Sequence, residues 1–207
     1  SQTDLEYSKS IEEISMGLID IARGYRRNNS CIINKEQTRS FVAKYIAMRI
    51  RLKSSDNTCI CPQICYHWTN PQNFEKIKEG DLKVPDGKIV KHVTDDGYYG
   101  KGIYTSNNPT FARRYGHGAK KVFVCLSITG KMYPATYPKD KGIGLKTGYD
   151  SHFNADYRDG RKNRQWVFFD SSQILLVYLT SLEELLFIHP MLEDMKKYIE
   201  SEIINIK

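Results

Sequence analysis

The ten residues from 97 to 106, Gly-Tyr-Tyr-Gly-Lys-Gly-Ile-Tyr-Thr-Ser, restrict the possible folds of this chain more than any other stretch. Three of the first six are glycines, which can adopt positive φ and let the backbone come close to a ligand. The Ile-Tyr-Thr run that follows combines β-branched and aromatic residues, which strands favour. We therefore expect a tight turn that leads into a short strand carrying Tyr104.

A helix is predicted directly after this strand. Asn108-Pro109 combines an N-cap residue with proline at the first helical position. Phe111, Ala112 and Tyr115 then fall on one face of the helix. The strand and the helix thus each present a tyrosine near a glycine-rich turn. This arrangement could form a wall for a flat, polar ligand, and core aromatics beside a tight turn are the structural alternative.

The composition is that of an ordinary globular protein. The chain has 207 residues, 40% hydrophobic and 27% charged, which fits one domain or one domain plus a helical extension. Its net charge of +7 favours anionic partners, namely nucleotides, nucleic acids or acidic proteins, without choosing among them. No apolar run reaches the ~18 residues of a membrane helix, and no secretion signal opens the chain. We expect no membrane contact and an intracellular location, cytoplasmic or nuclear, unless the protein is exported as an effector.

The cysteines bear on the compartment and on metal binding. An odd number without an even framework predicts reduced thiols in a cytosol-like compartment. The run from Cys59 to Cys65 lacks the spacing of a zinc knuckle, and no matching Cys or His pair follows it. We therefore predict that no metal is bound. The five cysteines are Cys31, Cys59, Cys61, Cys65 and Cys125.

The first 58 residues are predicted to form an N-terminal helical extension. After polar residues 1–9, Ser10-Ile-Glu-Glu13 has the pattern of a capping box that opens a first helix. Asn34 begins a second predicted helix that runs to about Leu52. The polar stretch 53–58 then marks a boundary, so that residues 59–207 form the second domain.

Strands predominate in this second domain, with helices on either side. Short links between the strands favour a mainly antiparallel or mixed sheet and an α+β fold. The longest irregular region is expected over residues 134–164, rich in glycine and charge. The predicted elements are a strand over 60–69, a helix after Asn70-Pro71, turns at 85–87 and 95–97, a strand buried on both faces over 121–128, strands over 165–169 and 174–180, and a C-terminal helix capped by Ser181-Leu-Glu-Glu184 and interrupted by Pro190.

Three segments, in this order and spacing, resemble the catalytic domain of the poly(ADP-ribose) polymerase family, the diphtheria-toxin-like ADP-ribosyltransferases. They are Tyr66-His-Trp-Thr69, the stretch from Gly100 through Tyr115, and the stretch from Gln165 through Gln173 to Leu179. Gly148-Tyr-Asp-Ser151 resembles a segment of the mono-transferring members. The resemblance covers about residues 62–180. It implies the ADP-ribosyltransferase fold, with a mixed, mainly antiparallel split sheet flanked by helices.

The resemblance also implies the site residues, of which His67, Tyr104 and Gln165 stand at the catalytic positions. His67 would bond a ribose hydroxyl of NAD, which an imidazole suits as both donor and acceptor. Tyr104 would line the nicotinamide site, and Tyr115 would stack on the nicotinamide ring. The structural alternatives are a histidine at a strand end and tyrosines in the core. The remaining expected NAD-binding residues are Trp68, Thr69, Gly102 and Ala112.

Three positions depart from the family pattern. Gln165 stands where the family has a glutamate, and an amide can neither act as a base nor stabilise an oxocarbenium-like centre by its charge. Polymer synthesis is therefore not expected, while transfer of a single ADP-ribose is. Trp68 replaces a glycine, and Ala112 replaces a serine that donates a hydrogen bond worth about 1 kcal/mol. Both changes predict weaker NAD binding.

The leading hypothesis is a monomeric mono-ADP-ribosyltransferase that uses NAD as co-substrate, needs no metal and modifies a macromolecule, more readily a protein than a nucleic acid. The loop over 134–164 would lie beside the acceptor, or would be only a solvated surface loop. The second hypothesis is a weak or inactive module that binds NAD, ADP-ribose or partners on the same fold. A stand-alone nucleic-acid binder ranks last, because the basic residues are scattered.

Overall fold

The computed structural model describes residues 2–80, 82–85 and 97–204, so the predicted turns at 85–87 and 95–97 lie largely outside the described residues. Within this part the strands are β1 (Thr58–Cys59), β2 (Gln63–His67), β3 (Ile103–Ser106), β4 (Val122–Ser127), β5 (Gly130–Ala135), β6 (Ser151–Asn154), β7 (Gln165–Phe168) and β8 (Ile174–Thr180). The α-helices are α1 (Gln2–Arg23), α2 (Lys35–Arg51), α3 (Phe74–Gly80) and α4 (Leu185–Ile204).

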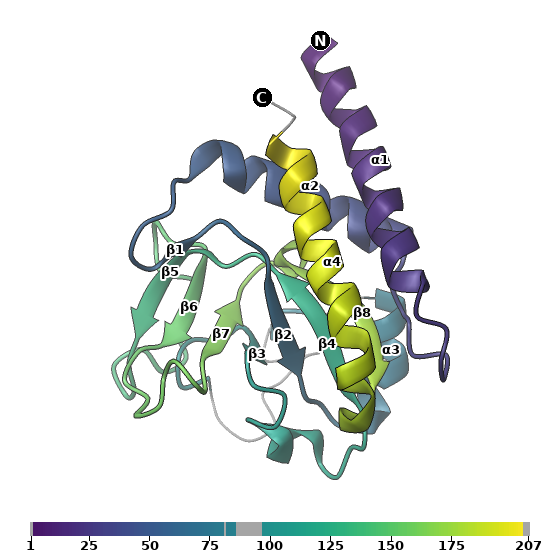
Figure 1. Ribbon diagram of the computed structural model, residues 1–207. Helices are drawn as coiled ribbons and strands as arrows, with labels where there is room; N and C mark the ends of the chain where they lie inside the picture. The colour runs from purple at the N-terminus through teal and green to yellow at the C-terminus, as the bar shows by residue number, and fades with distance from the viewer. Residues whose placement is uncertain (1, 81, 86–96, 205–207) are drawn as a thin grey trace.

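The described strands form one sheet in the order β1-β5-β6-β7-β3-β2-β4-β8 (Figure 1). Its neighbours are antiparallel except for β5 and β6, which run parallel. The expected α+β class with a mixed, mainly antiparallel sheet is thereby confirmed.

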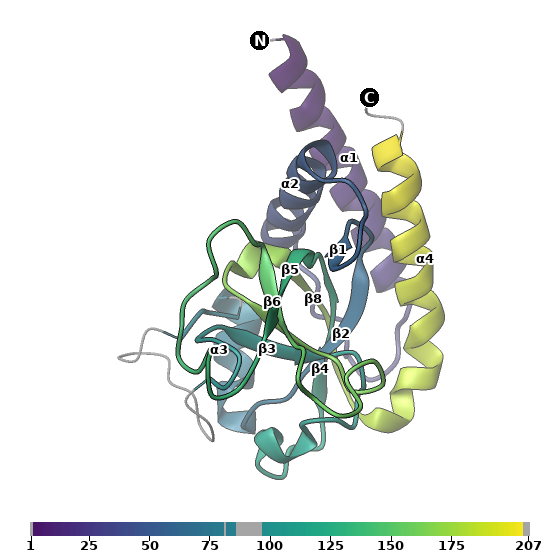
Figure 2. The ribbon, with the colours of Figure 1, turned by 90° about the vertical axis from the view of Figure 1, so that its left-hand side faces the viewer.

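Helices cover both faces of the sheet around β2, β4 and β8. Figure 2 shows α4 on one side of these strands and α3 on the other. Leu18 of α1, Phe41 of α2 and Ile188 of α4 are fully buried in one core cluster with alternate residues of β4 and β8. Phe74 of α3 packs edge-on against Phe123 of β4, on the opposite face. β4 is therefore buried on both faces, as the apolar residues on both of its sides predict.

Two of the predicted helix starts are confirmed. The side chain of Asn34 accepts a hydrogen bond from the backbone N–H of Gln37 and caps α2. Asn70 likewise accepts from the backbone N–H of Gln72, with Pro71 at the first position of a 3₁₀ turn that leads into α3.

Both predicted capping boxes are wrong. α1 begins at Gln2, so Ser10 lies within the helix, because residues 2–9 include strong helix formers that extend it. At the C-terminal helix, Ser181 makes no side-chain cap bond. The Glu184 carboxylate is occupied elsewhere, since it accepts hydrogen bonds from the hydroxyl of Tyr25 and the amide of Asn28.

Two further expectations need correction. Pro190 lies inside a continuous α4. The carbonyl that it leaves without a donor belongs to Leu186, which is 79% exposed, so water can serve that oxygen. The region 134–164 is not wholly irregular, because its residues Ser151–Asn154 form the buried strand β6 beside β5.

No described helix is long and apolar enough to cross a membrane.

Candidate functional site

The strands β2 and β3 separate where the sequence places the candidate histidine. They share a single residue pair, Tyr66 with Ser106, before they diverge. His67 is the last residue of β2, and its Nδ1 lies 2.7 Å from the backbone carbonyl oxygen of Tyr104 on β3. A side chain thus satisfies a carbonyl at the point where the two strands part.

This contact fixes the hydrogen-bonding state of the histidine. A carbonyl oxygen can only accept, so Nδ1 of His67 carries the proton and Nε2 is left as an acceptor. Burial lowers the pKa of His67, although the bond to Tyr104 opposes the shift. At neutral pH the ring is therefore uncharged and offers one acceptor nitrogen.

Tyr104 holds the glycine-rich turn through its side chain. Its hydroxyl donates to the Gly100 carbonyl at 2.7 Å and accepts from the backbone N–H of Tyr99 at 3.0 Å. Gly100 has φ of +118°, and a Cβ there would lie 2.8 Å from Nδ1 of His152. A Cβ at Gly102 would lie 2.5 Å from the Phe168 carbonyl oxygen. The glycines allow close packing of the turn against β6 and β7, and Tyr104 remains partly buried beside it.

The predicted helix after Asn108 is wrong. The Asn108 side chain does accept from the backbone N–H of Thr110, but Ala112 has φ of +66° and only a 3₁₀ turn, η2 (Arg113–Gly116), follows. The indole N–H of Trp68 donates to the carbonyl of Pro109 at 2.8 Å. In an α-helix the Pro109 carbonyl would accept from a backbone N–H four residues later, but here it is bonded to Trp68.

Trp68 packs against the segment that carries Tyr115. Trp68 is buried, and a Cβ on Gly116 would lie 3.0 Å from its ring. Tyr115 is partly buried against the core cluster that contains Trp68, and its hydroxyl accepts from the guanidinium of Arg114. The Trp68 indole therefore lies in the protein interior, packed against the segment that carries Tyr115.

Gln165 lies one strand further along the same part of the sheet. It is the first residue of β7 and pairs with Ser106, while Val167 pairs with Tyr104. Gln165 and Tyr104 therefore point to the same face. The backbone N–H of Gln165 donates to the side chain of Asn154, and within the described residues its own amide makes no hydrogen bond. β2, β3 and β7 are adjacent, so His67, Tyr104 and Gln165 lie on three neighbouring strands. Because Tyr66 pairs with Ser106 and His67 pairs with Phe123, the register places His67 on the opposite face from Tyr104 and Gln165.

Thr69 has a structural partner. Its hydroxyl accepts a hydrogen bond from the amide of Asn73 at 2.9 Å, across the turn that precedes α3. The predicted role of Thr69 in binding a dinucleotide stays a prediction.

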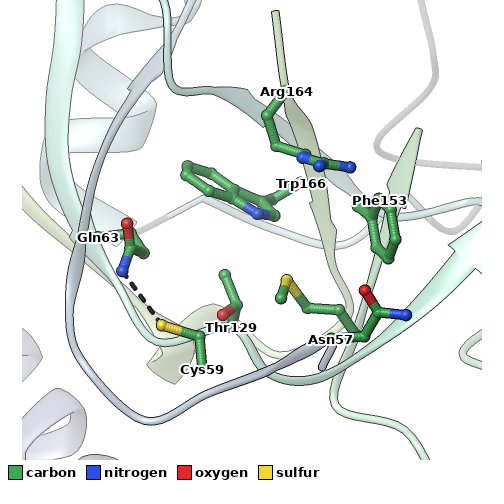
Figure 3. Close-up of a pocket in the computed structure, with 8 residues that line it drawn as sticks. Asn57, Cys59, Gln63, Thr129, Phe153, Arg164 and Trp166 are labelled. Atoms are coloured by element: carbon green, nitrogen blue, oxygen red, sulfur yellow. Dashed lines mark hydrogen bonds between the residues drawn. The ribbon is translucent and has the colours of Figure 1, made fainter. Parts of the chain in front are cut away.

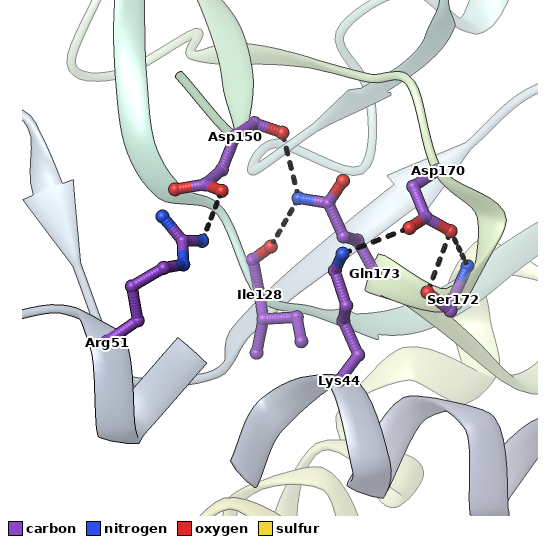
Figure 4. Close-up of polar contacts among 7 residues, drawn as sticks. All are labelled: Lys44, Arg51, Ile128, Asp150, Asp170, Ser172 and Gln173. Carbon is purple, nitrogen blue, oxygen red and sulfur yellow. Dashed lines mark hydrogen bonds and ion pairs between the residues drawn. The ribbon is translucent and has the colours of Figure 1, made fainter. Parts of the chain in front are cut away.

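The Tyr-Asp-Ser segment and Gln173 connect neighbouring elements of the fold through polar contacts (Figure 4). The Asp150 carboxylate accepts from the backbone N–H of Lys131 at 2.9 Å and pairs with Arg51 of α2 at 2.5 Å. The buried amide of Gln173 donates to the carbonyls of Ile128 and Asp150, both at 3.0 Å. These residues join β5, β6, β8 and α2. Local patterns do not reveal this role, because every partner is distant in sequence.

A buried histidine that sequence reasoning missed supports the glycine-rich turn. Nδ1 of His152 lies 2.7 Å from the carbonyl of Tyr99, and its Nε2 accepts from the backbone N–H of Lys146 at 2.9 Å. Burial lowers the pKa of His152. Both ring nitrogens are therefore hydrogen-bonded to backbone groups, and His152 is a structural residue.

A separate cavity of about 190 Å³ lies beside β1 and β5 (Figure 3). Cys59, Gln63, Thr129, Phe153, Arg164 and Trp166 are among its lining residues, and we call it the β1–β5 cavity. Gln63 begins β2 and His67 ends it, so four residue steps of about 3.3 Å separate them, or roughly 13 Å. The cavity thus lies away from His67, but its lining residues Arg164 and Trp166 flank Gln165.

No protein-family model matches this chain, and no curated protein matches it. Within residues 2–80, 82–85 and 97–204, no group of three or more His, Cys, Asp or Glu side chains could hold a metal ion.

Proposed function

We propose that this protein is an NAD-dependent mono-ADP-ribosyltransferase that resembles the poly(ADP-ribose) polymerase family and shares its split-sheet fold. The observation that carries the proposal is the contact between His67 and Tyr104 at the divergence of β2 and β3. It joins two residues 37 positions apart that the resemblance assigns to one site. Gln165 lies on the adjacent strand β7 and shares a face with Tyr104.

The proposed NAD-binding role of His67 follows from its tautomer. Nε2 can accept a hydrogen bond from a ribose hydroxyl, because Nδ1 carries the proton. Tyr104 would contact the nicotinamide with its ring, since its hydroxyl is occupied by the turn. Tyr115 would stack on the nicotinamide ring from the η2 side. Trp68 leaves its backbone groups for the carboxamide, while its indole is used to hold Pro109.

The proposed reaction is a substitution at C1 of the nicotinamide ribose. Nicotinamide leaves with the electron pair of the C1–N bond and becomes neutral. An acceptor oxygen or nitrogen forms a bond to C1 and loses a proton to solvent. Gln165 can orient a ribose hydroxyl by hydrogen bonds, but it cannot take this proton. One transfer without elongation is the expected result, and the net charge of +7 favours an acidic protein as acceptor.

A specific observation favours the second candidate, a module that binds NAD or ADP-ribose with little turnover. His67 is neutral and Gln165 is an amide, so neither side chain supplies the negative charge that would stabilise an oxocarbenium-like centre.

Labelled NAD distinguishes the two candidates. We expect the protein to release nicotinamide and to modify itself with single ADP-ribose units, and His67→Ala to lower the rate about tenfold or more. The control is His189→Ala, which removes an exposed histidine of α4. NAD binding without release would instead favour the module, and long polymer ladders would contradict the mono-transfer proposal.

Gln165→Glu tests the chemistry at the same position. The substitution preserves side-chain length, and the β7 backbone stays held by Asn154. Because it adds a base and a negative charge, we expect nicotinamide release to rise about 10²-fold. An unchanged rate, with NAD binding intact, would count against the assignment of Gln165 to the reacting centre.

A further inference from the structure

Most of the net charge of the chain lies in four short segments. Residues 98–101, 111–114, 137–141 and 155–164 contain nine lysines and arginines against three aspartates, which gives a formal charge of +6. The whole chain has +7, so the charges outside these segments nearly cancel. A surface that joins the four segments would therefore attract anions more strongly than the rest of the molecule.

Hydrogen bonds bring these segments together. The backbone N–H of Gly142, directly after the third segment, donates at 2.8 Å to the carbonyl of Gly97, directly before the first. The backbone N–H of Tyr137 donates to the carboxylate of Asp156 at 2.7 Å and so joins the third segment to the fourth. The folded backbone thus gathers charges that are spread along the sequence. We call the face formed by the four segments the aromatic–basic surface.

Exposed aromatic rings lie along this surface. The rings of Tyr98 and Tyr137 are stacked with their centroids 4.1 Å apart, and the two residues remain 40% and 43% exposed. Tyr157 is 39% exposed, and Phe111 of the second segment contacts its ring edge-on at 5.3 Å. Because Tyr157 directly follows Asp156, to which Tyr137 is bonded, the two aromatic pairs are neighbours. The surface therefore carries accessible rings from all four segments.

The aspartates of this surface leave most of its positive charge available. Asp140 is buried and accepts a hydrogen bond from the hydroxyl of Tyr133, while Asp156 accepts from a backbone N–H. In the described part of the chain, neither Arg158 nor Arg161 forms an ion pair with a carboxylate. Both arginines are exposed, so an external polyanion can pair with them.

The combination of cations and exposed rings favours single-stranded nucleic acid over other anions. Its phosphates pair with lysine and arginine, and each of its unpaired bases has a face that can stack on an aromatic ring. A duplex supplies the phosphates, but the faces of its bases are covered by neighbouring base pairs. An acidic peptide can pair with the cations and would leave the rings unused.

We propose that the aromatic–basic surface binds single-stranded nucleic acid. The phosphates lie along the lysines and arginines, and bases stack on the exposed rings of Tyr98, Tyr137 and Tyr157. The fourth segment leads directly into Gln165, so the surface borders the proposed NAD site. Binding of the strand requires neither NAD nor turnover, and the proposal does not rest on the proposed function.

Fluorescence anisotropy on the whole chain tests the proposal in the absence of NAD. The probes are labelled oligothymidylate and oligouridylate of about 16 nucleotides, the upper end of a typical binding site for single strands. We expect both to bind, and a duplex of the same length to bind at least about fivefold more weakly because it cannot stack on the rings. Unlabelled polyglutamate should compete less well than unlabelled single strand at equal charge.

Aromatic variants separate stacking from charge. Tyr98→Ala and Tyr157→Ala each remove an exposed ring from one of the two aromatic pairs, and each should weaken single-strand binding about fivefold or more. The matched control is Phe187→Ala, which removes a 47% exposed ring from α4 and should leave affinity unchanged. Circular dichroism checks that all three variants are folded.

Charge variants measure the phosphate contacts. Arg158→Gln and Arg161→Gln should each lower the slope of log affinity against log salt concentration by about 0.7. Lys53→Gln and Lys197→Gln remove exposed lysines outside the surface and should leave this slope unchanged.

The same measurements can overturn the proposal. Absence of single-strand binding would do so, as would a duplex or polyglutamate that binds as tightly as the single strand. Tyrosine variants that bind as tightly as the unmodified protein would show that the rings are not used, and the assignment would be wrong. Since NAD is absent from the assay, a failure here is distinguishable from a failure of the proposed transfer reaction.

Discussion

Gln173 offers the sharpest test of the scaffold that holds the candidate site. Its amide donates to the carbonyls of Ile128 and Asp150, and the residue is only 2% exposed. Gln173→Met keeps the length of the side chain and removes both donors. Each buried carbonyl left without a partner costs about 1–3 kcal/mol, and Asp150 lies nearer to solvent, so we expect a loss of about 2–4 kcal/mol. For a chain of this size that corresponds to a fall in Tm of about 4–16 °C.

Urea unfolding followed by circular dichroism measures this loss, with Gln165→Met as the matched control. Gln165 opens β7, the strand that precedes Gln173 in the chain, but its amide has no partner within the described residues. Its replacement should change the free energy of unfolding by no more than about 0.5 kcal/mol. Equal costs for the two variants would show that the Gln173 bonds do not contribute to stability, and the scaffold role assigned to it would be wrong.

Three further outcomes follow from the structure. His67 and His152 have lowered pKa values, so below about pH 6.5 the unfolded chain binds more protons than the folded chain. The free energy of unfolding, measured with urea across pH, should therefore be full above that pH and fall as the pH is lowered through it. Asp150→Ala should cost about 2–3 kcal/mol because a backbone N–H loses its carboxylate partner, whereas Arg51→Met, half-exposed, should cost at most about 1 kcal/mol; equal melting temperatures would contradict this. Gly100→Ala should destabilise by at least about 1–3 kcal/mol from its positive φ alone, and a melting temperature equal to that of the unmodified protein would contradict the packing described.

The features that could be predicted from sequence are those fixed by neighbours along the chain. Asn34 and Asn70 cap helices through bonds to N–H groups two or three residues away, so their signal is local. The apolar run from 122 to 126 likewise indicates a strand covered on both faces, because neither face of it can be left to water. His67, expected near the end of a strand over 60–69, is the last residue of β2.

The features that could not be predicted depend on distant partners. The chain after Asn108 turns away from an α-helix because Trp68, about 40 residues earlier, takes the Pro109 carbonyl. Glu184 fails to cap its helix because Tyr25 and Asn28 hold its carboxylate. β6 spans only four residues and is stabilised by its neighbours β5 and β7, so no periodicity reveals it. In each case a tertiary bond outweighs a local preference of about 1 kcal/mol.

The hydrogen-bonding groups that remain available at the candidate site are suited to ligand binding more than to catalysis. The Tyr104 hydroxyl and Nδ1 of His67 are engaged within the protein, which leaves Nε2 of His67 and the Gln165 amide for a ligand. Both groups are uncharged at neutral pH, and their backbones are fixed by neighbouring strands. In the proposed NAD site, each of these groups would hold a ribose hydroxyl by a hydrogen bond. Neither group carries a charge that would stabilise the ribose as the C1–N bond breaks. The two hydrogen bonds would therefore stabilise the bound substrate and the transition state equally. Under the proposed function we therefore expect slow transfer with measurable NAD affinity.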